Sequence, residues 1–217
     1  MQYLLMGFAP GLYWLWYYYK RDKLNPESKR LVIRAYLAGI FVAFFVVLAQ
    51  LPIHVSPRVS AVIFAPLFEE SGKLLMTLLI IYRHKDFDEP IDGIIYAAAV
   101  ALGFASIENA MYLFNAGKAS SYMLSNTMLI RSLLSVPAHA LFSGIWGYAL
   151  GKSKCIATYS WIRVIPALLL AMLLHGLFNL FCFMNYFATF ALLVLVAGMW
   201  EIANSNIRRE LLGGRKK

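Results

Sequence analysis

The sequence has little charge and almost no cysteine. Only 14% of its 217 residues are charged, whereas 61% are hydrophobic, and the mean hydropathy is +0.65. A soluble domain is typically about a quarter charged and about half apolar, so this composition excludes an ordinary soluble domain. The two cysteines, Cys155 and Cys182, are too few for a disulfide framework, and we interpret them as a loop thiol and a small hydrophobic residue.

Several catalytic motifs are absent as well. The sequence contains no His-Glu-x-x-His, which excludes the zincin-like and site-2 types of metalloprotease. It contains no Gly-x-Ser-x-Gly, so a serine nucleophile has no support. Asp92 stands at the start of an apolar segment, and no aspartate lies in the interior of one, which excludes an aspartyl pair of the presenilin type.

The chain consists instead of apolar segments of about 20 residues, each long enough to cross about 30 Å of hydrocarbon. We predict an all-α, polytopic integral membrane protein that forms one membrane-embedded domain over residues 1–217. The very short connector near Met184 and Asn185 leaves six spans with a re-entrant end as an alternative. The seven predicted spans are 3–19, 31–52, 60–82, 91–114, 128–150, 163–184 and 186–203.

Lysine and arginine are unequally distributed between the connectors. Most of the 20 lie in the first, third and fifth connectors and in the C-terminal tail, whereas the opposite side has Arg58 and Lys118, with Arg131 just inside the fifth span. Because basic residues favour the cytoplasmic side, this pattern predicts the N-terminus outside and the C-terminus in the cytoplasm. It also explains the net charge of +9, so we expect the lipid bilayer and no nucleic acid as a partner.

The fourth span has a marked start. Asp88, Glu89, Pro90 and Asp92 precede or open it, and acidic residues with an early proline suit a helix N-terminus and the positive end of its dipole. Asp92 could instead pair with an arginine of a connector.

Five ionisable side chains stand inside the apolar segments, where each costs several kcal/mol by the lower estimates. A rise of 1.5 Å per residue puts those of the third to sixth spans about 9–17 Å from the predicted outer interface. Ionisable groups at one depth on four helices indicate a hydrolytic or metal-binding site in the bilayer. They are Glu69, Glu70, Glu108, His139 and His175.

Helical spacing adds two residues to this group. Lys73 follows Glu69 by four residues and Glu70 by three, so it shares a face with a carboxylate and can orient the pair. Asn179 follows His175 by four residues, and we expect its amide to donate a hydrogen bond to an oxyanion.

Two imidazoles and a carboxylate are a standard ligand set for catalytic zinc, which leaves a fourth position for water. We therefore predict His139, His175 and Glu108 as metal ligands, zinc as the cofactor, and Glu69 or Glu70 as the base that activates the water. A metal-free alternative has a glutamate-activated water and imidazole donors at the oxyanion. A proton- or ion-coupled transporter is a second functional class, because carboxylates and histidines also form relays.

These motifs, in their order along the chain, resemble the PrsW family of bacterial intramembrane proteases over about residues 10–179. The resemblance implies site-1 cleavage of a membrane-anchored anti-sigma factor, on the extracytoplasmic side of the bacterial plasma membrane, in an envelope-stress response. The predicted depth of the site agrees with that side. The motifs are Glu69-Glu70-x-x-Lys73, Phe104-x-x-x-Glu108, Ser135 to His139, His175-x-x-x-Asn179 and Phe87-Asp88-Glu89-Pro90-x-Asp92-Gly93.

A more distant resemblance is to the CAAX prenyl endopeptidases, which have a Glu-Glu pair, a Phe-x-x-x-His and a His-x-x-x-Asn. This sequence carries Glu108 in place of the first histidine and Lys73 where that family has an arginine one residue later, which favours the PrsW family. A CAAX-type enzyme would open toward the cytoplasm. A transporter would open to both sides and would usually show repeated halves, which this sequence lacks.

Overall fold

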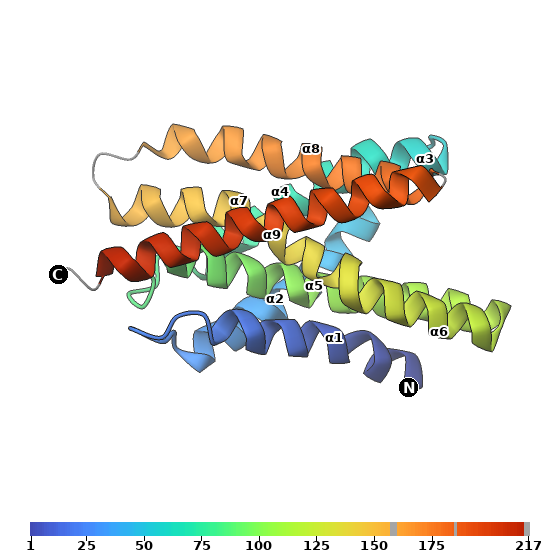
Figure 1. Cartoon of the computed structure of the whole chain (residues 1–217), viewed down its shortest axis with the longest axis horizontal. Coiled ribbons are helices and arrows are strands. Elements are labelled where there is room, and N and C mark those ends of the chain that lie inside the picture. Colours follow the sequence, from blue (N-terminus) through green and yellow to red (C-terminus); the bar gives the residue numbers. More distant parts are fainter. Residues whose placement is uncertain (157–159, 185, 215–217) are drawn as a thin grey trace.

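The structure is a computed structural model that describes residues 1–156, 160–184 and 186–214 (Figure 1). Over these residues the chain is 85% helical, contains no strand, and forms seven continuous helical segments. The predicted all-α, polytopic architecture is confirmed. The connector residue Asn185, on which the six-span alternative depended, lies outside the described residues.

Two of the seven segments contain a π-helical turn. The third has a π-helical turn at Ser60–Phe64, and the fifth has one at Arg131–Ser135. A π-helical turn widens the helix locally and is frequent at functional sites. The helices are α1 (Gln2–Tyr19), α2 (Lys29–Gln50), α3 (Pro57–Val59), α4 (Ala65–Ile80), α5 (Pro90–Ala119), α6 (Ser121–Ile130), α7 (Val136–Cys155), α8 (Val164–Cys182) and α9 (Tyr186–Gly214).

Five helical stretches of the described chain are long and apolar enough to cross a membrane. The other two predicted spans, 3–19 and 60–82, coincide with α1 and with the segment from α3 to α4, so each predicted span corresponds to one helical segment. The five stretches are Lys29–Gln50, Pro90–Ala119, Ser121–Cys155, Trp161–Cys182 and Ala188–Leu212.

The last helix continues well beyond the predicted end at residue 203. Its polar end packs on the bundle, because Ile207 is buried and Arg21 donates a hydrogen bond to Asn204 over 2.5 Å. The Tyr148 hydroxyl likewise donates to Glu210 over 2.5 Å. Contacts with the rest of the fold, rather than hydrophobicity alone, therefore keep this part of the chain helical.

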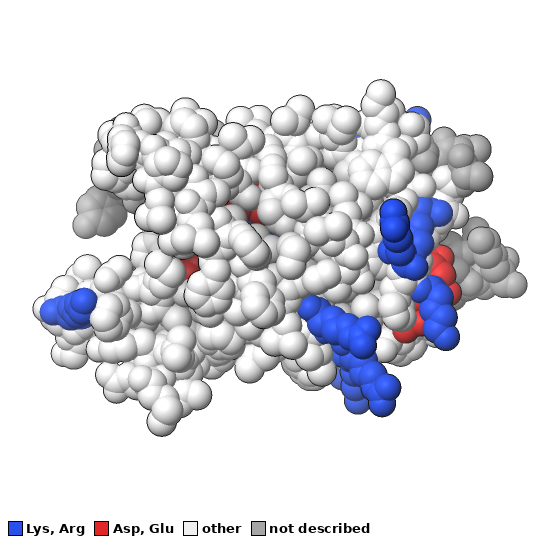
Figure 2. Space-filling view, turned by 180° about the vertical axis from the view of Figure 1, so that it is seen from behind, with Lys and Arg blue, Asp and Glu red and all other residues white. Residues whose placement is uncertain are grey.

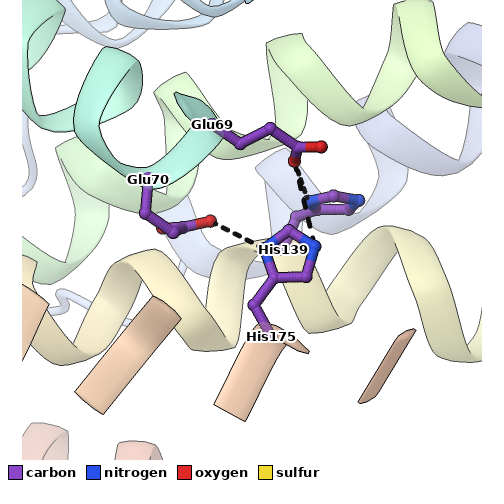
Figure 3. A group of neighbouring side chains, drawn as sticks. All are labelled: Glu69, Glu70, His139 and His175. Carbon is purple, nitrogen blue, oxygen red and sulfur yellow. Dashed lines mark hydrogen bonds and ion pairs between the residues drawn. The ribbon is translucent and has the colours of Figure 1, made fainter. Parts of the chain in front are cut away.

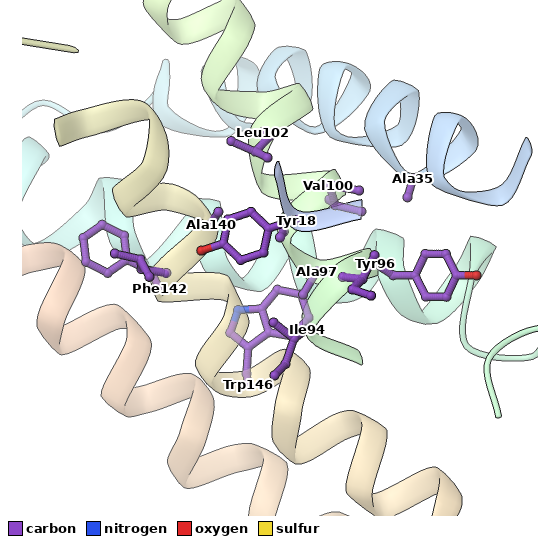
Figure 4. Close-up of a cluster of buried hydrophobic side chains, with 14 of the residues drawn as sticks. Tyr18, Ala35, Ile94, Tyr96, Ala97, Val100, Leu102, Ala140, Phe142 and Trp146 are labelled. Carbon is purple, nitrogen blue, oxygen red and sulfur yellow. The ribbon is translucent and has the colours of Figure 1, made fainter. Parts of the chain in front are cut away.

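Helix α5 is the centre of the bundle, with α1, α2 and α7 packed around it (Figure 1). Its first four turns are buried almost without interruption, and the surrounding core includes Tyr96, Phe142 and Trp146 (Figure 4). The helices approach closely at glycines, since a methyl group on Gly39 of α2 would overlap with the carbonyl oxygen of Val100. Small residues at such crossings are typical of helix packing in membranes.

The two ends of the bundle differ in charge. Figure 1 places the chain termini at opposite ends, and the connectors 20–28 and 81–89 lie at the end that carries the C-terminus. Lysine and arginine gather at that end (Figure 2). This arrangement is the one that the predicted orientation requires, and which end faces the cytoplasm stays a prediction.

Candidate active site

The glutamate pair and Lys73 lie on α4, which begins directly after the π-helical turn of the third segment. All three side chains are buried. The Lys73 ammonium donates to Glu70 Oε1 over 2.8 Å and to Glu69 Oε2 over 3.3 Å. One ammonium therefore holds both carboxylates, in the geometry predicted for Lys73.

His139 of α7 is held from two sides. Its Nδ1 lies 3.2 Å from Lys73 Nζ, and its Nε2 lies 2.9 Å from Glu108 Oε2. Because an ammonium can only donate, Nδ1 is the acceptor and Nε2–H donates to the carboxylate of Glu108. The tautomer and the ring orientation of His139 are therefore fixed by its neighbours.

His175 of α8 makes a similar contact with Glu70. Its Nδ1 lies 3.2 Å from Glu70 Oε1, to which it can donate. Its other nitrogen, Nε2, lies 3.8 Å from Glu69 Oε2. The ring stacks on Phe142 with a centroid distance of 4.5 Å and an interplanar angle of 10°, which restricts its rotation. Carboxylates of two different helices thus orient the two imidazoles.

Three atoms that could ligate a metal ion face one another at the centre of this arrangement. Glu69 Oε2 is 3.8 Å from Nδ1 of His139 and 3.8 Å from Nε2 of His175 (Figure 3). The side chains come from α4, α7 and α8. Residues far apart in the sequence therefore converge, as predicted, on one point inside the helical bundle.

The second oxygen of Glu70 is bound by two donors that the sequence analysis did not identify. Ser143 Oγ donates to Glu70 Oε2 over 2.8 Å, and the indole N–H of Trp146 donates over 3.0 Å. Both follow His139 at helical spacing, by four and seven residues, and this spacing was the available signal. Glu70 is thus fixed through both oxygens.

Glu108 is bound by a residue that the sequence analysis treated only as a charge near the interface. Arg131, in the π-helical turn before α7, donates to Glu108 Oε2 over 2.7 Å and to Asn109 Oδ1 over 3.1 Å. Its guanidinium also lies over the Tyr112 ring, 3.9 Å from the centroid. A basic residue at the depth of a buried carboxylate on a neighbouring span was the signal for this pair.

Asn179 lies at the same site, but its amide is already engaged. Its Nδ2 donates to the carbonyl oxygen of Ala61 over 2.8 Å. Ala61 belongs to the π-helical turn before α4, so this bond joins α8 to the segment that carries the glutamate pair. The predicted oxyanion role of Asn179 stays a prediction.

A cavity of about 290 Å³ gives access to the converging donors. Its walls include Glu69, Glu108, His139 and His175, whereas Glu70 lies behind them. Two wall residues, Ala61 in the π-helical turn after α3 and Phe183 directly after α8, belong to the ends of these segments that lie at the side of the bundle opposite the C-terminus (Figure 1). The cavity therefore extends toward the end predicted to be extracytoplasmic.

The donor set fits a zinc-type ion. Glu69, Glu70, His139 and His175 are all buried and each offers a ligand atom within 4.8 Å of the others. Imidazole and carboxylate ligands suit zinc, and carboxylates that accept the second N–H of each imidazole are typical of zinc sites. An ion at this point would compete with Lys73 for Nδ1 of His139. The prediction of Glu108 as a direct ligand stays a prediction, because its oxygen is shared by Arg131 and His139.

One known protein family matches most of the chain. A model of the PrsW family intramembrane metalloproteases matches residues 27–202. The chain belongs to the PrsW family. The resemblance that the motifs predicted is therefore confirmed, and this PrsW family member is an intramembrane protease and a multi-pass membrane protein.

Curated relatives support the assignment over most of the chain. The protein is 38% identical to "Protease PrsW" of Geobacillus kaustophilus over 178 residues, which cover 80% of this chain and 76% of the relative. It is 34% identical to "Protease PrsW" of Oceanobacillus iheyensis, over 95% of this chain and 94% of the relative. It is 32% identical to "Protease PrsW" of Bacillus subtilis, over 80% and 79% of the two chains. No solved structure matches the chain significantly.

Proposed function

We propose that this PrsW family protease hydrolyses a peptide bond of a single-span membrane protein in the cavity between α4, α5, α7 and α8. The observation that carries the proposal is the convergence of Glu69 Oε2, His139 Nδ1 and His175 Nε2, at separations of 3.8 Å from Glu69, on the wall of that cavity. This is the place where a water molecule and a substrate carbonyl can meet.

Glu69 is the residue that we assign to the water. It lines the cavity, whereas Glu70 lies behind it and is bound through both oxygens. Its second oxygen points away from the imidazoles (Figure 3). As the water oxygen adds to the substrate carbonyl carbon, a water proton passes to Glu69, and Glu69 then delivers it to the leaving amide nitrogen. This assignment chooses between the two bases that the sequence left open.

Zinc is the ion that we assign to this point, with His139 Nδ1 and His175 Nε2 as its imidazole ligands, whereas Glu69 acts on the water. When bound, the ion would lower the pKa of its water and polarise the substrate carbonyl. Glu108 and Glu70 would then act through the imidazoles, as acceptors for His139 Nε2–H and His175 Nδ1–H. In this proposal Lys73 keeps the two buried carboxylates together.

The substrate that the family resemblance favours is a membrane-anchored anti-sigma factor, cut near the extracytoplasmic face. A cavity of about 290 Å³ does not admit a folded domain, so the substrate must present an extended stretch of chain. A single-span protein can supply such a stretch where its helix ends at the interface. Cleavage at that depth agrees with the position of the glutamates below the outer end of α4.

The proposal is tested with protein purified in detergent and a single-span anti-sigma factor as substrate. Metal analysis compares the wild type with His139→Ala, His175→Ala and the exposed control His54→Ala. We expect one zinc per chain in the wild type and in the control, and loss of zinc and of cleavage in both site variants. An active wild type without metal would contradict the zinc assignment and leave the glutamate mechanism. Zinc-loaded protein that cuts no single-span substrate would contradict the proposed function.

A further inference from the structure

A second group of carboxylates lies at the opposite end of the protein from the cavity. Asp22 of the connector 20–28, Glu89 before α5 and Asp92 in the first turn of α5 each offer an oxygen within 4.8 Å of the others. Asp22 is 3% exposed and Asp92 is 1% exposed. Like charges buried this close repel one another, so the group needs a compensating positive charge.

Each of the two aspartates uses only one oxygen for the local fold. Asp22 Oδ1 accepts from the backbone N–H of Leu24 over 3.0 Å and of Asn25 over 3.2 Å. Asp92 Oδ2 accepts from the N–H of Asp88 over 2.8 Å and of Glu89 over 2.7 Å. The turn and the helix cap are therefore complete without the remaining oxygens.

Those remaining oxygens, Asp22 Oδ2 and Asp92 Oδ1, are buried and have no hydrogen-bond partner. Across the described residues the only other buried side-chain atom in this condition is Ser132 Oγ. A buried polar atom without a partner costs about 1–3 kcal/mol, and more when it is charged. Two such oxygens in one acidic group indicate a ligand.

A fourth carboxyl group, that of Glu27, completes the surroundings. Its Oε2 accepts a hydrogen bond from the Tyr96 hydroxyl. The Lys154 ammonium interacts electrostatically with Asp92, but its hydrogen bonds go to the carbonyl oxygens of Tyr82 and His84.

We propose that Asp22, Glu89 and Asp92 bind a hard divalent cation, Mg²⁺ or Ca²⁺, which ties the connector 20–28 to the start of α5. Both ions prefer carboxylate oxygens, and Mg²⁺ retains several waters when it binds to few carboxylates. An all-oxygen set distinguishes this site from the histidine-containing site in the cavity, which suits zinc. The cation supplies the partner that the two buried oxygens lack.

The experiment uses the full-length protein in detergent after treatment with EDTA. Thermal unfolding is followed with and without millimolar MgCl₂ or CaCl₂, in separate arms. We expect either cation to raise the midpoint by several degrees, because a ligand that binds only the folded state stabilises it. Terbium(III), a luminescent substitute for hard cations, should show saturable emission excited through tyrosine, which the preferred cation displaces.

Two variants test the ligands without removing the local hydrogen bonds. Asp22→Asn and Asp92→Asn each retain an oxygen for the backbone N–H groups but lose the charge. We expect each to lower terbium affinity at least tenfold and to abolish the shift in midpoint. Asp86→Asn, a partly buried aspartate outside the group, should respond like the wild type. Glu69→Gln should do so too, which separates this site from the one in the cavity.

In EDTA, without a bound cation, we expect the order of stability of the wild type and Asp22→Asn to be reversed. Removal of one of several crowded charges should make Asp22→Asn at least as stable as the wild type in EDTA, although it is less stable in the presence of the cation. An unchanged wild-type midpoint, or a full response in both Asn variants, would overturn the proposal. If the variants do not fold, the wild-type protein alone decides. The proposal is then overturned if terbium emission does not saturate, or if neither Mg²⁺ nor Ca²⁺ displaces the terbium.

Discussion

The guanidinium of Arg131 lies 2.7 Å from the carboxylate of Glu108, and the same oxygen of Glu108 lies 2.9 Å from Nε2 of His139. The Arg131 guanidinium, in the wall of the cavity, is thereby linked through the Glu108 carboxylate to the imidazole of His139. The side chain of Arg131 is 12% exposed and that of Glu108 is 25% exposed, so the pair is largely shielded from water. We expect this largely buried pair to orient the His139 imidazole more than it stabilises the fold.

Replacement of Arg131 should therefore affect catalysis through His139. We expect Arg131→Leu to lower kcat by about 10–100-fold, as is typical when the partner of a ligating histidine is disturbed. Arg131→Lys should recover part of the loss, because it restores the charge but lacks the planar guanidinium whose separate N–H groups donate to Glu108 and Asn109. The measurement is steady-state cleavage in proteoliposomes. The exposed Arg58→Leu is the matched control, and an Arg131→Leu enzyme with only KM changed would argue for substrate contact instead.

Replacement of Glu69 and replacement of Glu70 should differ in their effect on the unfolding midpoint. Glu69→Gln should abolish cleavage and lower the unfolding midpoint less than Glu70→Gln does, because Glu69 lines the cavity and its hydrogen bond with Lys73 is 3.3 Å long. Glu70→Gln should also lower the midpoint, because Glu70 binds Lys73, His175, Ser143 and Trp146 while fully buried. Removal of one partner of a buried ion pair typically costs about 3–5 kcal/mol.

The comparison is made by cleavage assay and thermal unfolding of the same preparations. Glu201→Gln, on an exposed glutamate that pairs with Arg208, is the control for loss of a carboxylate. Cleavage by Glu69→Gln at the wild-type rate would remove Glu69 as the base.

Zinc content separates the two assignments of Glu108. If Glu108 acts through His139, Glu108→Gln should weaken zinc binding by about 10–100-fold and recover one zinc per chain when zinc is in excess. If Glu108 is a direct ligand, as the sequence predicted, this variant should resemble His139→Ala and stay without zinc. Metal analysis after dialysis against graded zinc concentrations distinguishes these outcomes.

Much of this architecture could be predicted from the sequence, because the bilayer imposes strong rules. A run of about 20 apolar residues must be helical, since the hydrocarbon offers no partner to the backbone. Ionisable residues in such runs are rare, so Glu69, Glu108, His139 and His175 were conspicuous. Their shared depth followed from the rise per residue, and the structure brings them together at one cavity.

What could not be predicted depends on how the helices rotate and pack. Glu69 and Glu70 are adjacent, and only the packing of α7 and α8 decides which of them faces the cavity. Ser143 is an ordinary residue in an apolar helix, and its donation to Glu70 depends on the crossing of α4 and α7. Asp22 lies in a polar connector, where no pattern of residues predicts burial, yet it is 3% exposed.

The close approach of α2 and α5 should be sensitive to a single methyl group. Gly39→Ala should lower the stability by about 1–3 kcal/mol, the usual cost of overpacking, because the added methyl would overlap with the backbone of Val100. Gly198→Ala in α9 is the matched control, since a methyl group there meets nothing within 4 Å. Alanine favours a helix over glycine by up to about 1 kcal/mol, so the control should be neutral or slightly more stable. Equal midpoints for the two variants would contradict the packing.

The orientation of the bundle can be measured on whole cells. In a background with Cys155→Ser and Cys182→Ser, a single cysteine replaces either Lys118 at the end of α5 or Lys85 in the connector 81–89. Because most Lys and Arg residues gather at the end that carries the C-terminus, we expect that end to face the cytoplasm. A thiol reagent that does not cross membranes should therefore label Lys118→Cys on intact cells and Lys85→Cys only after permeabilisation. The reverse pattern would place the cavity on the cytoplasmic side and contradict extracytoplasmic cleavage.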